Sequence, residues 1–141
     1  MTAVPRFHLA FPVRDLDEAR GFYGGLLECN EGRSSGEWVD FDFFGHQIVA
    51  HLSAGFGGAE EHNWVDGEKI PVPHFGIILD MEKWRNLAAK LKGAGAKFLV
   101  EPAIRFEGGP GEQATFFIAD PSGNALEFKT FRDMSKIFAR D

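Results

Sequence analysis

The order of predicted elements in the first half of the chain is repeated in the second half. Alternating apolar residues predict a strand over 6–12, an amphipathic helix follows from Asp15, and three further strands end near Leu52. The same order of strand, helix and three strands starts again at His74 and ends near Lys129. This repetition predicts an α+β protein of 141 residues built from two tandem βαβββ modules.

Helix-capping and turn residues mark the same places in both predicted modules. Asp15 and Asp80 each precede a run of apolar residues at helical spacing, which is typical of an N-cap. The glycine pair at 24–25 weakens the end of the first helix and predicts that it stops near there. Gly45 and Gly123 each turn the chain into the last strand of a module.

The segment between the two predicted modules has no periodicity and is rich in glycine, proline and acidic residues. Over 53–73 we expect a linker or a lid-like loop that borders the mouth of a site. Trp64 is the large aromatic residue in its distal part. We expect it either to cover a pocket when substrate binds or to pack on the surface of a mobile linker.

Charge and composition exclude several classes of partner. The formal net charge is −6, from 15 Lys+Arg against 21 Asp+Glu, so we expect no nucleic-acid partner. No apolar run approaches the roughly 20 residues that a membrane span needs, and residues 1–6 lack the apolar stretch of a signal peptide. Cys29 is the only cysteine, which excludes an intrachain disulfide and favours the cytoplasm.

Two histidines and one glutamate are the candidate metal ligands. His8 and His74 open the two modules, and each alternates with apolar neighbours on its predicted strand. Glu127 lies on the last strand, and a carboxylate in a phenylalanine-rich sheet is unfavourable unless it is paired or bound to a metal. Two histidines and one carboxylate match the facial triad of non-heme Fe(II) oxygenases. The same set can also hold Zn²⁺, Mn²⁺, Co²⁺ or Ni²⁺.

His51 is a candidate fourth ligand on the last strand of the first module. It lies six residues after Gly45, whereas Glu127 lies four residues after Gly123. Because the difference is two residues, both side chains are predicted on the same face of their strands. If the two hairpins have the same shape, this difference also displaces the side chain of His51 by roughly 6–7 Å and places Val49 at the equivalent position. A different hairpin length or a bulge would remove this displacement. His51 is therefore either a metal ligand or a histidine that lines the site.

Several stretches of the chain resemble the vicinal-oxygen-chelate superfamily, which contains glyoxalase I, extradiol dioxygenases, methylmalonyl-CoA epimerase and the bleomycin- and fosfomycin-resistance proteins. The most specific is the Asp-Pro-x-Gly-Asn-x-x-Glu hairpin at 120–127, and the others are 7–16, 19–24 and 73–76. The stretches at 31–35 and 38–47 more narrowly resemble small bacterial proteins described as predicted extradiol-type dioxygenases.

The resemblance implies a single domain whose paired modules form curved mixed sheets that enclose a metal. The expected parts are module one at about 5–53, a loop at about 54–73, module two at about 74–131 and a tail at 132–141. The family's metal ligands correspond to His8, His74 and Glu127. Glyoxalase I has a further acidic ligand where this chain offers His51, which argues against a standard glyoxalase I.

The resemblance also implies a divalent-metal-dependent enzyme that chelates a small substrate through two vicinal oxygens. We expect a dioxygenase-like oxidoreductase with Fe(II). A glyoxalase-type isomerase, lyase or epimerase with Zn, Ni, Co or Mn is the alternative, and a drug-binding resistance protein is an alternative of another class. Extradiol dioxygenases use a tyrosine for acid–base work, but Tyr23, the only tyrosine, lies on a predicted helix and is expected to pack.

Substrate contacts and the oligomeric state complete the expectations. Arg33 and Arg105 are candidates for binding an anionic group, with solvent exposure as the alternative for both. Trp38 and Phe117 are expected to line the pocket or to belong to the core. We expect a homodimer, because paired modules leave sheet edges and apolar faces that association would bury.

Overall fold

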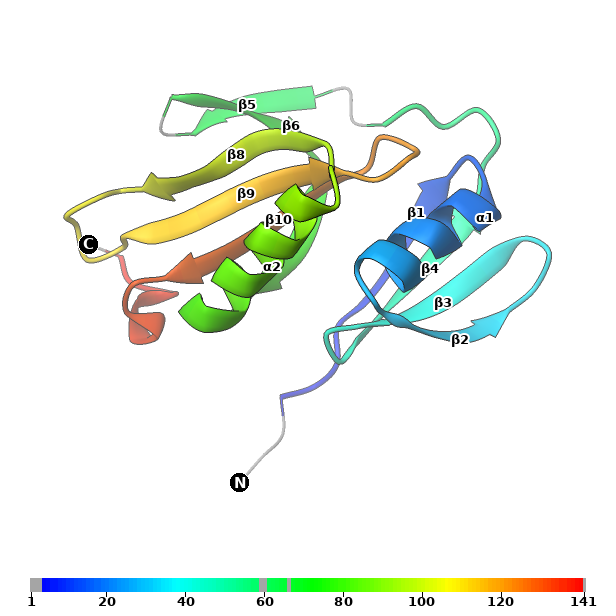
Figure 1. The fold of residues 1–141 in the computed structure, drawn as a ribbon, viewed down its shortest axis with the longest axis horizontal. Helices are drawn as coiled ribbons and strands as arrows, with labels where there is room; N and C mark the ends of the chain where they lie inside the picture. Colours follow the sequence, from blue (N-terminus) through cyan, green and yellow to red (C-terminus); the bar gives the residue numbers. More distant parts are fainter. Residues whose placement is uncertain (1–3, 59–60, 66, 141) are drawn as a thin grey trace. The chain divides into compact units, whose positions relative to one another are not determined.

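The computed structural model describes residues 4–58, 61–65 and 67–140, which contain two four-stranded mixed sheets and a two-stranded hairpin (Figure 1). The chain forms two compact units, and each is described by itself. The first consists of residues 1–57 and 120–122, and the second of residues 58–119 and 123–141. Each contains one βαβββ module, which confirms the predicted fold class.

The first unit is a sheet with the strand order β1-β4-β3-β2. Its strands are β1 (His8–Val13), β2 (Asn30–Ser34), β3 (Trp38–Phe43) and β4 (His46–Leu52). β1 pairs parallel with β4, and the other pairs are antiparallel. After β1 the chain forms α1 (Leu16–Ala19), whose N-cap Asp15 accepts a hydrogen bond from the Glu18 amide as predicted, and continues into a π-helix, η1 (Arg20–Leu26).

The second unit repeats this topology with the strand order β7-β10-β9-β8. Its strands are β7 (His74–Ile78), β8 (Phe98–Arg105), β9 (Gln113–Ala119) and β10 (Ala125–Phe131). Helix α2 (Met81–Gly93) starts at the predicted N-cap, Asp80, and packs on one face of this sheet (Figure 1). A short 3₁₀ turn, η2 (Met134–Lys136), follows β10.

One local prediction was wrong. The segment predicted as an irregular loop contains an antiparallel hairpin, β5 (Glu61–Val65) and β6 (Glu68–Val72), although residues 59–60 and 66 of it lie outside the described part. β6 is held by tertiary packing, because Ile70 is buried in a cluster with Val100 and Phe117. The first helix, in contrast, ends at Leu26, directly after the glycine pair at 24–25, as the sequence predicted.

Aromatic side chains fill the core of each unit. Tyr23 is fully buried in the first unit and contacts the rings of Phe11, Phe22 and Phe41. In the second unit, Phe116 packs against the rings of Trp84 on α2 and Phe128 on β10. Among the described residues, no helix has both the length and the apolar character that crossing a membrane requires.

A buried hydrogen bond attaches the β9–β10 turn to the core of the first unit. The Tyr23 hydroxyl donates to Oδ2 of Asp120 at 2.8 Å, and the Ser122 amide donates to Oδ1 of the same carboxylate at 2.9 Å. The Arg14 amide donates to the Ser122 hydroxyl at 2.9 Å. The first residue of the Asp-Pro-x-Gly-Asn stretch therefore has a structural role, and Tyr23 is a core residue, as the sequence predicted.

We expect Tyr23→Phe to lower the free energy of unfolding by about 1–3 kcal/mol, because it leaves a buried carboxylate oxygen without its donor. Burial, followed by the Asp120 charge, raises the pKa of Tyr23 well above its ordinary value. The stability that comes from the neutral phenol is complete below about pH 10 and is lost as pH rises further. In urea unfolding at several alkaline pH values, the free energy of unfolding should therefore fall less steeply with pH in the variant than in the wild type. An unchanged dependence would contradict this.

Candidate metal centre

His74 and Glu127 lie side by side on the face of the second sheet opposite α2. Glu127 is opposite Phe117 on β9 and Gly76 on β7, whereas its neighbour Phe128 faces the helix side. The Nε2 atom of His74 lies 3.2 Å from Oε1 of Glu127. The structure thus brings together two of the predicted ligands within one unit.

The hydrogen bonds of His74 determine which of its nitrogens carries a proton. Nδ1 lies 2.8 Å from the carbonyl oxygen of Pro71, which can only accept, so Nδ1 is the donor. In a neutral imidazole Nε2 then carries the lone pair, and this is the nitrogen that faces Glu127. The Phe117 ring packs edge-on against the imidazole with centroids 4.9 Å apart, which fixes the orientation of the ring.

The environment of Glu127 favours its ionised form. Burial is the largest single influence and acts to raise the pKa. Hydrogen bonds with His74 and Thr115 outweigh it and hold the pKa of Glu127 below its ordinary value. The Thr115 hydroxyl donates to Oε2 at 2.6 Å, so this bond occupies one carboxylate oxygen and leaves Oε1 towards His74.

A lone pair on Nε2 that faces a carboxylate oxygen at 3.2 Å requires a cation between or beside the two atoms. One solution is a proton on Nε2, and the hydrogen bond to Glu127 accordingly raises the pKa of His74. A divalent metal ion is the other solution, because imidazole nitrogen and carboxylate oxygen are both ordinary ligands of such ions. The chemistry of this pair therefore fits a metal.

His8 in the first unit has the same arrangement of donors and acceptors. Its Nδ1 lies 2.7 Å from Oε1 of Gln47, the residue directly opposite on β4. The amide nitrogen of Gln47 donates to Oδ2 of Asp40 at 3.3 Å, which orients Oε1 towards the imidazole. His8 therefore donates through Nδ1 and keeps the Nε2 lone pair available, as His74 does.

The strand register determines the position of His51. His74 is opposite Ala125, and Glu127 lies two residues further along β10. The corresponding residue after Gln47 on β4 is Val49, and His51 lies two residues beyond Val49, opposite Pro12. His51 and His8 share a sheet face. His51 lies four residues after Gln47, the residue opposite His8, so the two positions are roughly 13 Å apart along the strands.

The other predicted site residues have different surroundings. Phe117 is buried against His74, and Trp38 is half-buried opposite His51. Arg33 is exposed and lines a shallow pocket of about 340 Å³ that also includes Gln47, the partner of His8. Trp64 on β5 is 74% exposed. These positions are compatible with a role in binding substrate for Arg33 and Trp38, and with a supporting role for Phe117.

Sequence reasoning missed three groups that position the ligands. They are the Thr115 hydroxyl, the Pro71 carbonyl and the Gln47 side chain. Alternation on β9 places Thr115 on the same face as Phe117, so its position beside Glu127 follows once the strands are paired. The Pro71 carbonyl has no signal in the sequence, because any residue carries one.

Gly76 permits the close approach of β7 to β10 at the site. A Cβ atom added there would overlap the carbonyl oxygen of Glu127 and crowd its carbonyl carbon and amide nitrogen. All three are backbone atoms of a central strand, so they have little freedom to move. Glycine is therefore required two residues after His74 for Glu127 to lie where it does.

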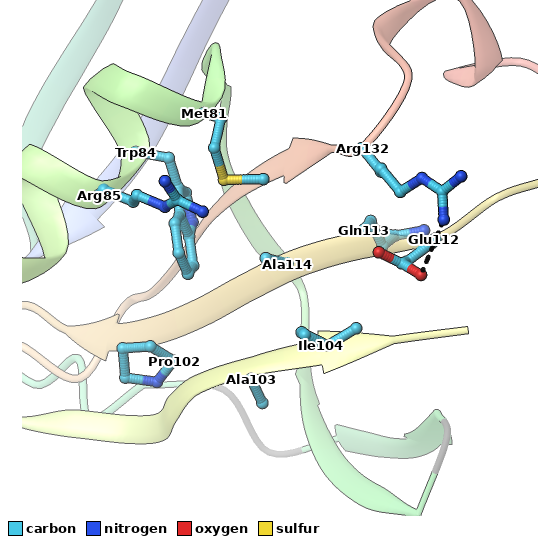
Figure 2. Close-up of a pocket in the computed structure, with 10 residues that line it drawn as sticks. All are labelled: Met81, Trp84, Arg85, Pro102, Ala103, Ile104, Glu112, Gln113, Ala114 and Arg132. Atoms are coloured by element: carbon cyan, nitrogen blue, oxygen red, sulfur yellow. Dashed lines mark ion pairs between the residues drawn. The ribbon is translucent and has the colours of Figure 1, made fainter. Parts of the chain in front are cut away.

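The second unit has a pocket on the helix side of its sheet (Figure 2). It has a volume of about 350 Å³, and Trp84, Ile104 and Ala114 form part of its apolar lining. Arg132 and Glu112 form an ion pair of 3.7 Å at its edge. Since neither His74 nor Glu127 lines it, this pocket is separate from the candidate metal centre.

Comparisons with known proteins agree with the repeated topology. The family model described as "Glyoxalase/Bleomycin resistance protein/Dioxygenase superfamily" matches residues 7–128. A protein from Alicyclobacillus acidocaldarius, whose crystal structure is described as glyoxalase/bleomycin resistance protein/dioxygenase, is 39% identical. That match covers 95% of this chain and 96% of the other, with a TM-score of 0.82.

More distant structures share the fold alone. A fosfomycin resistance protein from Listeria monocytogenes is 16% identical over 92% of this chain and 94% of its own, with a TM-score of 0.66. A lactoylglutathione lyase from Agrobacterium tumefaciens is 15% identical over 92% and 96%, with a TM-score of 0.61. No curated protein matches the chain significantly.

We expect Gly76→Ala to destabilise the second unit by more than about 3 kcal/mol, because the added methyl group overlaps backbone atoms of β10. Gly93→Ala is the matched control, since a Cβ at the end of α2 meets nothing within 4 Å. That change should be neutral or stabilise the protein by up to about 1 kcal/mol. Thermal unfolding of both variants tests this, and equal stabilities would contradict the close approach.

Proposed function

Because the chain belongs to the glyoxalase/bleomycin resistance protein/dioxygenase superfamily, we propose that it is a divalent-metal-dependent enzyme that chelates a small substrate through two vicinal oxygens. The observation that carries the proposal is the His74–Glu127 pair. Its two acceptor atoms face each other at 3.2 Å, with the other ends of both side chains already hydrogen-bonded to Pro71 and Thr115. Such a pair is organised to share a cation.

We assign His8, His74 and Glu127 as the metal ligands. Nδ1 of each histidine already has an acceptor, which leaves Nε2 for the metal in both modules. His51 lies on the same face as His8 but two rows away, so we assign it to the wall of the site rather than to the metal. Arg33, Trp38 and Trp64 are the proposed substrate contacts.

The metal would act as a Lewis acid that stabilises negative charge on the chelated oxygens. The protein's own groups prepare the site for it. Thr115 holds Glu127 ionised and occupies one of its two oxygens, while Pro71 and Phe117 fix the imidazole of His74. These contacts lower the cost of organising the ligands when the metal binds.

The reaction that we favour is dioxygenase-like, with Fe(II) as the metal. Two histidines and one carboxylate are the ligand set of non-heme Fe(II) oxygenases, and three protein ligands leave positions for a bidentate substrate. A reducing compartment such as the cytoplasm would suit both Fe(II) and a chain with one cysteine.

An isomerase, lyase or epimerase that uses Zn, Ni, Co or Mn is the second candidate. Tyr23 favours it, because the only phenol of the chain is fully buried and donates to Asp120. Acid–base work by a tyrosine is therefore not available to this protein. The two candidates share the metal centre and differ in their use of O₂.

We expect Glu127→Ala to abolish metal retention while the fold is preserved. The wild-type protein, produced without a histidine tag, should contain close to one equivalent of a divalent metal per chain by elemental analysis. The variant loses an anionic ligand, and circular dichroism should show the same secondary structure. Thr115→Val should weaken metal binding by roughly 10- to 100-fold, since it removes only the group that orients Glu127.

His62→Ala is the matched control, because His62 is exposed on β5. It should retain the full metal content, as should His51→Ala if that residue only lines the site. A wild-type protein that binds no divalent metal would overturn the proposal in favour of a metal-free, drug-binding protein. O₂ uptake with a panel of catechols then separates a dioxygenase from an isomerase or lyase.

We also propose that the protein is a homodimer. Leu99, Ile104 and Phe106 lie on or next to the edge strand β8 and are 40–52% exposed, which leaves apolar surface at an unpaired sheet edge. Light scattering at micromolar concentration should therefore give about twice the 15.6 kDa mass of the chain. A mass of one chain under these conditions would rule out the dimer.

A further inference from the structure

Arg105, at the end of β8, is a buried cation whose Nη2 atom has no hydrogen-bond partner in the described part of the chain. Its exposed fraction is only 6%, so the solvent-exposed arginine that the sequence allowed is not what the structure contains. The Nη2 atom is shielded from solvent and has no hydrogen-bond acceptor among the described residues. A guanidinium group carries five N–H donors and no acceptor, so a shielded N–H needs an oxygen from elsewhere.

The strand register places Arg105 on the same sheet face as Glu127. Arg105 is opposite Gln113 on β9, and Gln113 lies on the same face as Thr115 by strand alternation. Thr115 donates to Glu127, so this face carries the candidate metal centre. Arg105 is not among the residues that line the helix-side pocket, although its neighbours Ile104 and Gln113 are (Figure 2).

Lys129 adds a second positive charge to the same face. It lies two residues after Glu127 on β10 and opposite Thr115, between the rows of Glu127 and Arg105. Its charge acts on both His74 and Glu127 by lowering their pKa values, although it is a smaller influence than their hydrogen bonds. This face therefore carries the His74–Glu127 pair at one end and the cations Lys129 and Arg105 towards the other.

The distance between the two ends follows from the register. Glu127 is opposite Phe117, and Arg105 is opposite Gln113 four residues away on the same strand. The backbones are thus separated by roughly 14 Å along the strands and, across two strand spacings, by roughly 10 Å. A small molecule bound at the metal would span this separation together with the lengths of the two side chains, and its opposite end would then meet Arg105.

We propose that Arg105 binds an oxyanion, a carboxylate or a phosphoryl group, at the end of the substrate opposite to the chelating oxygens. The inference rests on the proposed function, because the metal defines the other end. Arginine presents paired donors that match the oxygens of either group, and a shielded donor without an acceptor favours a ligand that supplies one. Lys129 is placed to attract the same negative charge.

The first experiment measures the anion site on metal-free protein and so does not depend on the metal centre. Acetate and inorganic phosphate are titrated separately at constant ionic strength, with the melting temperature as the readout. Both the wild type and Arg132→Met, which changes an exposed arginine, should be stabilised by at least one of the two anions. The anion that acts identifies the group as carboxylate or phosphoryl.

Arg105→Met should lose this response and yet melt at the same or a higher temperature without ligand, because it removes a buried charge that has no partner. A merely structural arginine would behave in the opposite way, since its removal lowers the melting temperature. An anion response that persists in Arg105→Met, or that is absent from the wild type, would overturn the proposal.

The second experiment uses metal-loaded protein with 3,4-dihydroxybenzoate and 3,4-dihydroxybenzamide, which differ only in the charged group. The wild type should bind the benzoate roughly 10- to 100-fold more tightly. Arg105→Met should remove that preference, and Arg105→Lys should reduce it, because lysine lacks the paired donors. If Arg105→Met does not fold, an unchanged preference in Arg105→Lys would overturn the inference. Failure to bind any metal refutes the proposed function instead.

Discussion

The Glu127 carboxylate, set into a sheet of phenylalanine side chains, is the constraint on which the second unit depends. Burial alone would favour its neutral form, and hydrogen bonds from Thr115 and with His74 reverse that preference. An ionised carboxylate in this position needs a positive partner, and the Nε2 lone pair of His74 cannot be that partner without a proton or a metal. The local fold thus requires a cation beside Glu127, whether or not a substrate is bound.

Several features of the second unit surround the Glu127 carboxylate and hold it in place. β10 is flanked by β7 and β9, so Glu127 receives neighbours from both sides. Gly76 lets β7 approach closely, and the strand alternation of β9 presents Thr115 to the carboxylate. The chain before β7 supplies the Pro71 carbonyl that fixes the tautomer of His74. A single half-buried charge is therefore supported by three separate segments of the chain.

The sequence predicted what depends on local periodicity and missed what depends on pairing. Both helix caps and the alternation of the module strands follow from residues within a few positions of each other, and the structure confirms them. The hairpin at 61–72 was missed because the burial of Ile70 depends on Val100 and Phe117, which are distant in the chain. The candidate ligand His74 could be identified by residue type, but its tautomer could not, because a backbone carbonyl has no sequence signature.

Arg105 shows why unsatisfied groups are informative about function. A stable fold normally pairs its buried cations, since an unpaired one opposes folding. Among its described residues, the second unit satisfies the half-buried Glu127 from two neighbours and leaves Nη2 of Arg105, on the same face, without an acceptor. Selection for stability alone would favour an apolar residue there, as Met or Leu would fill similar space without a charge. An unfavourable buried charge on the face that also holds the proposed metal ligands is best explained by a ligand that neutralises it on binding.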